Sequence, residues 1–272
     1  MKAIQVIGVP WDEKSSFMRG CADAPGKIWD AFKCASSNPY TECGKDLSKS
    51  GVLRYYGNLM LSSGSIAGAE IEQQSSLSLD RKMTPLYLGG DHAITFPLIK
   101  GLSQKYDDLN ILHFDAHPDL YDELDGDRYS HGSSFVRILE GGYASRLISV
   151  GVRTMNARQQ EQADRFGVEI IDMRAFSSTR MPTFKGPVYI SIDLDVLDPA
   201  FAPGVSHHEP GGLTTRELIG CLQAVKGRVV AADLVEYNPY RDIQNVTAMV
   251  AAKLMKELAA KMLESGSLRE MI

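Results

Sequence analysis

The chain has 272 residues, of which 44% are hydrophobic and 23% charged, a composition typical of a soluble globular protein with a sizeable core. Its 29 Lys and Arg against 34 Asp and Glu give a formal net charge of -5 without a basic run, which argues against nucleic acid as a partner. No apolar stretch approaches the length of a membrane span, so we expect no membrane partner.

The first ten residues hold a short apolar stretch, and no small-residue cleavage site precedes the charged segment 12–14. These features predict a protein without a signal peptide, located in the cytoplasm. The four cysteines form no C-x-x-C pair, which argues against zinc-finger and redox motifs. We interpret them as buried or free thiols.

Apolar, β-branched runs bounded by Gly, Pro or acidic residues predict buried strands. They cover residues 3–9, 85–88, 110–114, 147–152, 168–171, 188–194 and 228–235. Apolar residues at helical spacing predict helices from Pro25 onward, over 97–106, 156–166 and 214–225, and along a final helix from Val246 to Met262.

Strands that alternate with helices predict an α/β fold: a single three-layer α/β/α domain with a mostly parallel central sheet. Residues 36–80 are richer in Ser and Gly and have weak periodicity, which indicates a loop-rich insertion. No linker composition or internal repeat divides the chain, so we expect one domain over residues 1–272.

Polar clusters follow four of these strands at the point where each strand ends. They comprise residues 89–92, 115–119, 193–195 and 236–238. In open α/β sheets, ligands bind beyond the carboxyl ends of the strands. Side chains alternate in direction along an extended chain, so we expect Asp115, His117 and Asp119 to share one side, as should Asp193 and Asp195.

This many acids and imidazoles predict a metal site. A single Asp after a strand commonly caps a turn, but several carboxylates this close would repel and protonate unless a cation neutralised them. With His92 the set has four Asp and two His and no thiolate, which suits Mn²⁺ better than structural zinc. It is also too large for one catalytic ion with an open position, so we infer two ions.

Two metal ions about 3.5–4 Å apart can share a water molecule and lower its pKa toward neutrality. The predicted reaction class is therefore hydrolysis. Glu236 ends a strand without an alternating acidic partner, and a carboxylate there could accept a planar guanidinium through paired hydrogen bonds.

Three stretches carry a resemblance to a known family. They read Leu-Gly-Gly-Asp-His-Ala-Ile-Thr-Phe-Pro at 88–97, Ile-Leu-His-Phe-Asp-Ala-His-Pro-Asp at 111–119, and Ser-Ile-Asp-Leu-Asp-Val-Leu-Asp-Pro-Ala-Phe-Ala-Pro-Gly at 191–204. With these motifs the chain resembles the ureohydrolases, the family of arginase, agmatinase and their relatives, and looks most like plant-type arginases. The similarity covers nearly the whole chain and implies the arginase/deacetylase-like fold.

Carried over position by position, the resemblance implies roles for eight residues. Two Mn²⁺ ions would be bound by His92, Asp115, His117, Asp119, Asp193 and Asp195, with Asp119 also counted as catalytic. Glu236 would hold the guanidinium, and His131 would carry protons between solvent and the leaving amine. The implied reaction is attack of a metal-bridging hydroxide on the guanidinium carbon, which releases urea and a primary amine.

The resemblance implies a small guanidino substrate, and L-arginine giving ornithine is our first expectation. Asn156 falls where an aspartate that contacts the substrate amine is expected. Agmatine giving putrescine, or another guanidino acid, therefore stays open. His207 is a further candidate for substrate contact. Family members commonly form trimers or hexamers, so we expect a homo-trimer or homo-hexamer by resemblance.

Two other functional classes remain as alternatives. A zinc deacylase of related fold would use one metal ion, whereas the residues here supply two full sites. A family member that serves only as a scaffold would not need every ligand, His131 and Glu236 intact. Three further residues, His113, Asp91 and Asp198, are interpreted as hydrogen-bonding or turn-stabilising residues outside the ligand set.

Overall fold

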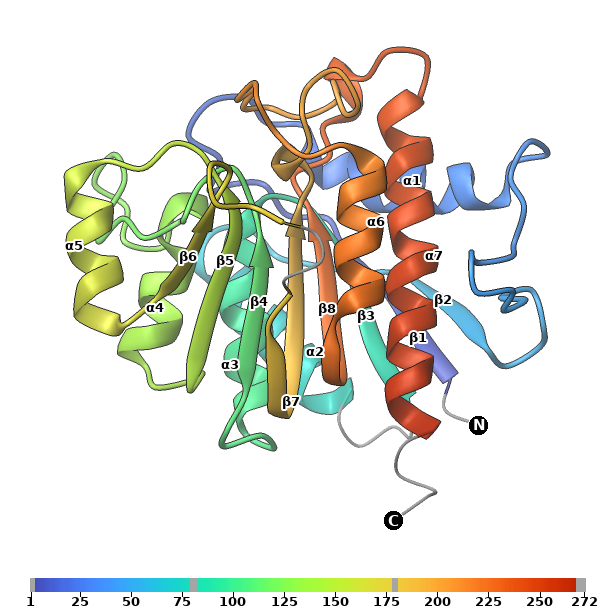
Figure 1. The fold of residues 1–272 in the computed structure, drawn as a ribbon, viewed down its shortest axis with the longest axis horizontal. Helices are drawn as coiled ribbons and strands as arrows, with labels where there is room; N and C mark the ends of the chain where they lie inside the picture. The colour runs from blue at the N-terminus through green and yellow to red at the C-terminus, as the bar shows by residue number, and fades with distance from the viewer. Residues whose placement is uncertain (1–2, 79–82, 178–180, 268–272) are drawn as a thin grey trace.

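The computed structural model describes residues 3–78, 83–177 and 181–267. Its sheet has eight strands in the order β2-β1-β3-β8-β7-β4-β5-β6 (Figure 1). Every pair of neighbouring strands is parallel. The strands are β1 (Ala3–Val9), β2 (Leu53–Asn58), β3 (Met83–Gly89), β4 (Asn110–Phe114), β5 (Arg146–Val152), β6 (Glu169–Asp172), β7 (Thr183–Asp193) and β8 (Lys226–Val235).

Helices cover both faces of this sheet, and Figure 1 shows α6 and α7 on the near face. Buried residues of α1, α6 and α7 join one core cluster, whereas those of α2 to α5 join the clusters on the opposite face. The predicted three-layer α/β/α fold is thus confirmed. The helices are α1 (Ala24–Lys33), α2 (Ser65–Ser78), α3 (Thr95–Ser103), α4 (Ser134–Glu140), α5 (Ala157–Phe166), α6 (Thr215–Ala224) and α7 (Val246–Ser267).

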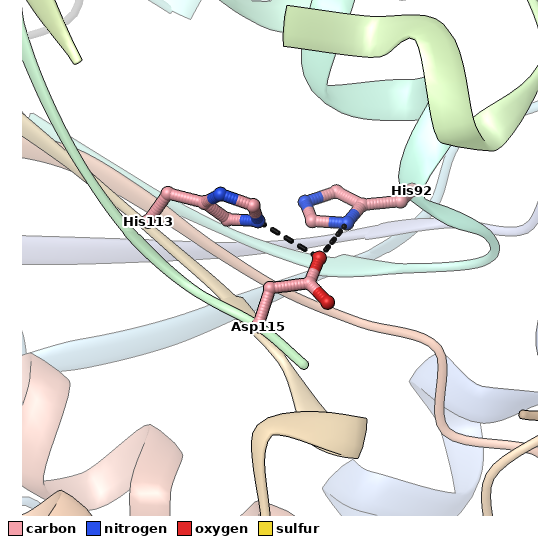
Figure 2. Close-up of side chains that lie close together, drawn as sticks. All are labelled: His92, His113 and Asp115. Carbon is pink, nitrogen blue, oxygen red and sulfur yellow. Dashed lines mark hydrogen bonds and ion pairs between the residues drawn. The ribbon is translucent and has the colours of Figure 1, made fainter. Parts of the chain in front are cut away.

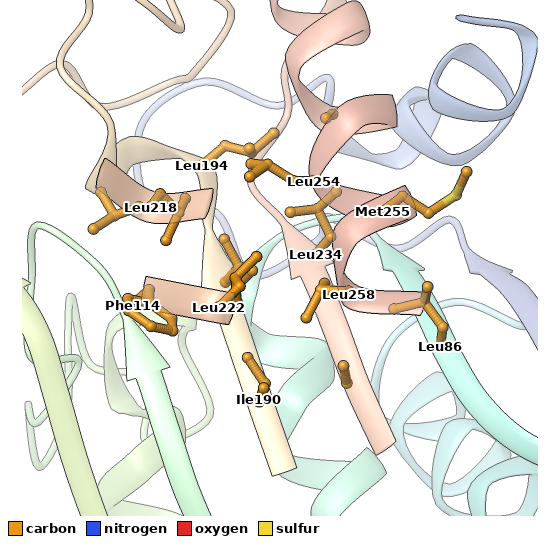
Figure 3. Packing of buried hydrophobic residues seen from close by; sticks show 14 of the residues in the cluster. Leu86, Phe114, Ile190, Leu194, Leu218, Leu222, Leu234, Leu254, Met255 and Leu258 are labelled. Atoms are coloured by element: carbon orange, nitrogen blue, oxygen red, sulfur yellow. The ribbon is translucent and has the colours of Figure 1, made fainter. Parts of the chain in front are cut away.

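The central strands are apolar on both faces because helices cover both. In β4, Leu112 and Phe114 pack in the cluster beneath α6 and α7, while Ile111 packs on the other side. Figure 3 shows Leu222 of α6 and Leu258 of α7 over this first face. Strands buried on both faces read as continuous apolar runs, which explains why the sequence pattern located the central strands. The edge strand β6 was also located, although none of its residues is buried.

Local chemistry sets the helix ends. The side chain of Thr214 accepts a hydrogen bond from the Glu217 N–H, and the Glu217 side chain accepts from the Thr214 N–H. This capping box starts α6 at the beginning of the predicted helix over 214–225. Helix α5 ends at Gly167, whose φ of 66° is a left-handed conformation that glycine adopts without strain. Among the described residues, no helix combines the length and apolarity that crossing a bilayer requires.

Residues 36–80 differ from the predicted loop-rich insertion, because they contain strand β2 and helix α2. Strand β2 is an edge strand, and exposed residues alternate along its whole length. Helix α2 buries only Ala67, Ile71, Ser75 and Ser78, two of which are polar. Such half-exposed elements carry too weak an apolar pattern to be recognised. The short helix α4 also went unpredicted.

Candidate metal centre and active site

Four neighbouring strands place the polar clusters side by side. In the sheet β3, β8, β7 and β4 are adjacent, although β8 is the last strand in the sequence. All four run in the same direction, so the residues that follow them meet at one edge. These residues include His92 after β3, Asp115 after β4, Asp195 after β7 and Glu236 after β8.

His92 lies among three carboxylates. Its Nδ1 is 3.2 Å from Asp115 Oδ2, 3.0 Å from Asp119 Oδ2 and 3.2 Å from Asp193 Oδ2. All four side chains are buried. Within the described residues, Nδ1 nevertheless has no partner in a position to form a hydrogen bond.

A chain of hydrogen bonds determines which nitrogen of His92 carries the proton. Ser191 Oγ donates its one proton to Asp233 Oδ1 at 2.6 Å, so it accepts from Nε2 of His92 at 2.9 Å. The proton is thereby assigned to Nε2, and the lone pair of Nδ1 faces the three carboxylates. The lone pair of Nδ1 and the carboxylate oxygens all face the same point. A cation bound at that point would neutralise the carboxylates and accept the lone pair. The residues therefore fit a bound metal ion.

Asp115 lies between two imidazole rings (Figure 2). Its Oδ2 accepts a hydrogen bond from Nε2 of His113 at 2.8 Å, on the opposite side from His92. Nδ1 of His113 contacts Ser149 Oγ at 3.0 Å, so both nitrogens of this buried ring are engaged. Burial raises the pKa of Asp115, but the imidazoles of His113, His117 and His92 together outweigh it and hold the pKa well below its usual range.

A second group of possible ligands comprises Asp115, His117 and Asp195. Nδ1 of His117 lies 3.0 Å from Asp195 Oδ2 and 3.4 Å from Asp115 Oδ1. The ligand atoms of this group lie within 4.8 Å of one another, as do those of His92, His113 and Asp115. Asp115 belongs to both groups. Burial opposes a charge on His117, yet the carboxylates of Asp195 and Asp115 together raise its pKa to about 12.

The carboxylates converge by a different route from the predicted strand alternation. Strands β4 and β7 end at Phe114 and Asp193, so Asp119 and Asp195 lie outside them. Asp119 has a positive φ of 50°. Asp195 lies in the 3₁₀ helix η4 (Leu194–Val196), where its N–H donates to Asp193 Oδ1 at 2.8 Å. Beyond the strand ends, backbone N–H and C=O groups lose their partners in the sheet and form hydrogen bonds within turns instead. These turns direct Asp119 and Asp195 toward the other carboxylates.

Glu236 follows β8 with a φ of 64°, a strained conformation that tends to occur at functional positions. Its Oε1 accepts from the His92 N–H at 2.8 Å and lies 3.5 Å from Nδ1 of His131, while Oε2 accepts from the Cys21 thiol at 3.5 Å. Burial raises the pKa of Glu236, but His131 outweighs it and lowers the pKa. The carboxylate therefore stays charged at neutral pH.

His131 lies in the 3₁₀ helix η3 (His131–Ser133), and its Nε2 contacts Ser16 Oγ at 2.8 Å. Burial opposes a charge on His131, yet the hydrogen bond with Glu236 raises its pKa to about 9. The ring of His207 stacks on it with centroids 5.3 Å apart. Burial lowers the pKa of His207, which keeps that ring neutral.

Asn156 is exposed and caps helix α5. Its side chain accepts from the Gln159 N–H, and its amide donates to the Tyr121 hydroxyl at 3.0 Å. The capping role by itself explains why an asparagine stands at position 156. Contact between Asn156 and a substrate therefore stays a prediction.

The two aspartates kept out of the ligand set bind backbone groups. Asp91 accepts from the N–H of Ala93 and Lys14, and burial together with Glu236 raises its pKa to about 7. Asp198 accepts from the N–H of Ala200 and Gly211. Both contacts accord with the turn-stabilising interpretation.

Three residues that support the site gave no prediction from the sequence. Asp233 is fully buried and accepts hydrogen bonds from Ser191, Tyr189 and Thr95. The sequence feature that could have identified it is a single acid inside the apolar run 229–235. Ser16 and Cys21 come from segments before α1 that have no distinguishing pattern. Only the folded chain brings them to His131 and Glu236.

A parallel sheet whose carboxyl edge gathers imidazoles and buried carboxylates defines a candidate metal-dependent hydrolase. The model of the arginase family matches residues 2–260, and the chain belongs to this family. It is an enzyme of the arginase/agmatinase ureohydrolase type, a hydrolase. The predicted resemblance to ureohydrolases, and to plant arginases within them, is confirmed.

Individual relatives agree with this assignment. Arginase 1 of Arabidopsis thaliana is 47% identical over 274 residues, which cover 94% of this chain and 80% of that protein. A solved arginase of Medicago truncatula has a TM-score of 0.91 at 43% identity and covers 96% of this chain and 87% of its own. An agmatinase of Bacillus cereus is 31% identical over 266 residues, covering 94% of this chain and 90% of that protein.

These relatives contradict the predicted cytoplasmic location. The Arabidopsis arginase is named as mitochondrial, and so are further plant relatives at 46% identity. The composition and first residues of the chain were therefore a poor guide to location.

Proposed function

We propose that the chain uses two Mn²⁺ ions to hydrolyse L-arginine to ornithine and urea. The observation that carries the proposal is the lone pair of His92 Nδ1 facing three buried carboxylates, which calls for a cation. Arginine is favoured over other guanidino compounds by the 47% identity to a plant arginase. The family assignment also argues against the zinc deacylase and the non-catalytic scaffold.

The proposed ligands combine four carboxylates, whose charge balances two divalent ions, with two imidazoles. This oxygen-rich set without thiolate suits Mn²⁺. When bound, the ions supply activation of a water molecule for attack at neutral pH. The six ligands are His92, Asp115, His117, Asp119, Asp193 and Asp195.

Three of the chain's own residues would then handle the substrate. The charged carboxylate of Glu236 would accept the guanidinium through its paired N–H groups. His131, with a pKa of about 9, holds a proton at neutral pH that it would give to the departing amine. Asp119 Oδ2, 3.0 Å from Nδ1 of His92, would also orient the attacking water.

Agmatine is the second candidate substrate. An agmatinase is among the relatives, and the uncharged asparagine at position 156 does not distinguish the two substrates, because both carry an ammonium group. His207 is neutral and lies beside His131, where it would contact the aliphatic part of either substrate.

The test is urea release by the Mn²⁺-loaded protein from arginine, agmatine, guanidinobutyrate, guanidinopropionate and guanidine. We expect arginine to give the highest kcat/KM and the metal content to be two Mn²⁺ per chain. A higher kcat/KM with agmatine would show that agmatine, not arginine, is the substrate. A single bound Zn²⁺ would overturn the metal assignment.

We also propose that residues 1–272 form one domain, because every described strand belongs to the same sheet. By family resemblance the protein would be a homo-trimer or homo-hexamer. Light scattering on the eluting protein measures this mass directly.

A further inference from the structure

A separate cavity of about 360 Å³ lies between α2, α3 and the segments around Trp11 and Tyr129. None of the six proposed metal ligands lines it. Its volume falls within the range of small-molecule sites, about 300–1,000 Å³. The cavity has no role in the proposed hydrolysis.

Two residues that line this cavity carry buried N–H groups without an acceptor. Trp11 is 6% exposed and Arg137 is 5% exposed. Among the described residues, neither the indole Nε1–H of Trp11 nor the Nε–H of Arg137 has a hydrogen-bond partner. Buried donors are rarely left unpaired in folded proteins. Both residues border the cavity, so an acceptor atom bound there is the candidate partner for these donors.

Most of the charged side chains in the cavity lining are cations. The lining holds the cations Lys14, Lys100 and Arg137 and one acid, Glu72. Lys100 pairs with Glu72 at 2.8 Å, and Lys14 and Arg137 pair with Asp127 and Asp122 just outside the lining. Arg137 also lies 3.3 Å from Glu140, so each of these cations already has an acidic partner. A carboxylate in the cavity would therefore be bound by the unpaired N–H groups and not by net charge.

The other walls favour a flat apolar body. The cavity is lined by the aromatic side chains of Trp11, Phe96 and Tyr129. The ring centroids of Phe96 and Tyr129 lie 5.7 Å apart. We propose that this cavity binds a small aromatic carboxylate, whose carboxylate accepts from the unpaired N–H groups and whose ring packs against these side chains.

The cavity wall shares main chain with the proposed metal centre. The hydroxyl of Ser134, a lining residue, donates to the carbonyl oxygen of His92 at 3.0 Å. The Asp91 N–H donates to the carbonyl oxygen of Trp11 at 3.0 Å. A bound carboxylate would therefore contact residues that hold the turn carrying His92.

Benzoate is the probe, and Trp11 reports on it. The chain has two tryptophans, so Trp29→Phe leaves Trp11 as the single tryptophan, which can be excited selectively over the tyrosines. We expect benzoate to change its emission saturably, in both Mn²⁺-loaded and metal-free protein. Absence of a saturable change overturns the proposal, and binding only to loaded protein would place benzoate at the metal centre instead.

Two glycines provide a blocking variant and its matched control. A Cβ at Gly68, which lines the cavity from α2, would meet no atom within 4 Å, and the same holds for Gly26 in α1, outside the lining. Added to the Trp29→Phe protein, Gly68→Leu should fill the cavity and abolish the response, whereas Gly26→Leu should keep it. A response that survives Gly68→Leu overturns the proposal.

A third variant tests the indole N–H itself. Trp11→Phe keeps an aromatic wall but removes the donor, and calorimetry should show benzoate affinity about tenfold weaker, as expected for loss of a hydrogen bond to a charged group. An unchanged affinity would contradict the proposed contact with Trp11.

Discussion

Glu236 combines burial, a strained backbone and a charge that its neighbours keep ionised. The contacts of its two oxygens hold the carboxylate in one orientation, between the His92 N–H and the Cys21 thiol. Its pairing with His131 links the group proposed to bind the guanidinium to the group proposed to give up a proton. Both roles therefore depend on one negative charge.

Removing this charge should stop catalysis without removing the metal. We expect Glu236→Gln to lower kcat/KM for arginine by at least about 100-fold, because the amide is neutral and only one of its terminal atoms accepts. The Mn²⁺ content should stay that of the wild type, since Glu236 is not a proposed ligand. Urea assays together with metal analysis check both, and a metal-depleted variant would show that its role is misassigned.

Gly90 lies where two backbone segments meet. An added Cβ would lie 1.8 Å from the carbonyl oxygen of Trp11, and backbone atoms cannot move aside as a flexible side chain can. The carbonyl of Gly90 also accepts from the Glu236 N–H at 3.0 Å, so a displaced Gly90 would disturb the site.

We therefore expect Gly90→Ala to lower the free energy of unfolding by about 3 kcal/mol or more, or to yield no folded protein. The control is Gly26→Ala in helix α1, where a Cβ meets nothing within 4 Å. That change should be neutral or stabilising by up to about 1 kcal/mol. Urea denaturation compares the two, and equal stabilities would contradict the close approach at Gly90.

At the scale of elements, one carboxylate joins the segment before β2 to helices α6 and α7. Glu42 accepts two hydrogen bonds from Arg216 at 2.7 Å each and lies 3.3 Å from Lys253. The hydrogen bonds from Arg216 lower the pKa of Glu42 from 4.5 to about 2. An irregular segment thereby gains a defined place on two helices.

This shift predicts a pH-dependent contribution to stability. A carboxyl whose pKa is depressed in the folded state stabilises above its unfolded pKa, and this stabilisation disappears as the pH falls from about 4.5 to about 2. Glu42→Gln should therefore be less stable than wild type at neutral pH, by at most about 1 kcal/mol because the pair is partly exposed.

The difference should vanish at the acid end of this window. Urea denaturation at several pH values measures the difference in free energy of unfolding between wild type and Glu42→Gln. When Arg216→Gln is present in both proteins, this difference should be smaller at neutral pH. A difference that is constant with pH would show that the charge of Glu42 is not its source.

At the scale of the whole molecule, the sheet collects buried acids at one edge. Burial, followed by Asp195 and Asp115, raises the pKa of Asp193 well above its usual range, so a cation there should stabilise the ionised folded state. We expect a chelator to lower the melting temperature and added Mn²⁺ to restore it.

The effect should correspond to about 4 kcal/mol when the ion is present at 1,000 times its dissociation constant. Calorimetry with and without the chelator measures it. Asp193→Asn should reduce the effect, whereas Asp172→Asn on edge strand β6 should leave it unchanged. Equal melting temperatures with and without chelator would argue against a resident metal ion.

Local sequence patterns were enough to predict the central strands, five of the helices and the identities of the clustered acids and histidines. Strands buried on both faces have uninterrupted apolar runs, and polar residues immediately after such runs must lie at the sheet edge. These features depend on residues close together in the chain. Strand β2 and helix α2 stayed hidden, because their half-exposed surfaces lack that contrast.

The assembly of the site, in contrast, depends on the folded chain. Folding brought β8 between β3 and β7, turned Asp119 and Asp195 inward outside their strands, and set Ser191 and Asp233 to hold the proton on His92 Nε2. It also brought Ser16 and Cys21 to His131 and Glu236. The physical reason is that each of these contacts joins residues from different elements, so its geometry depends on packing that no local pattern encodes.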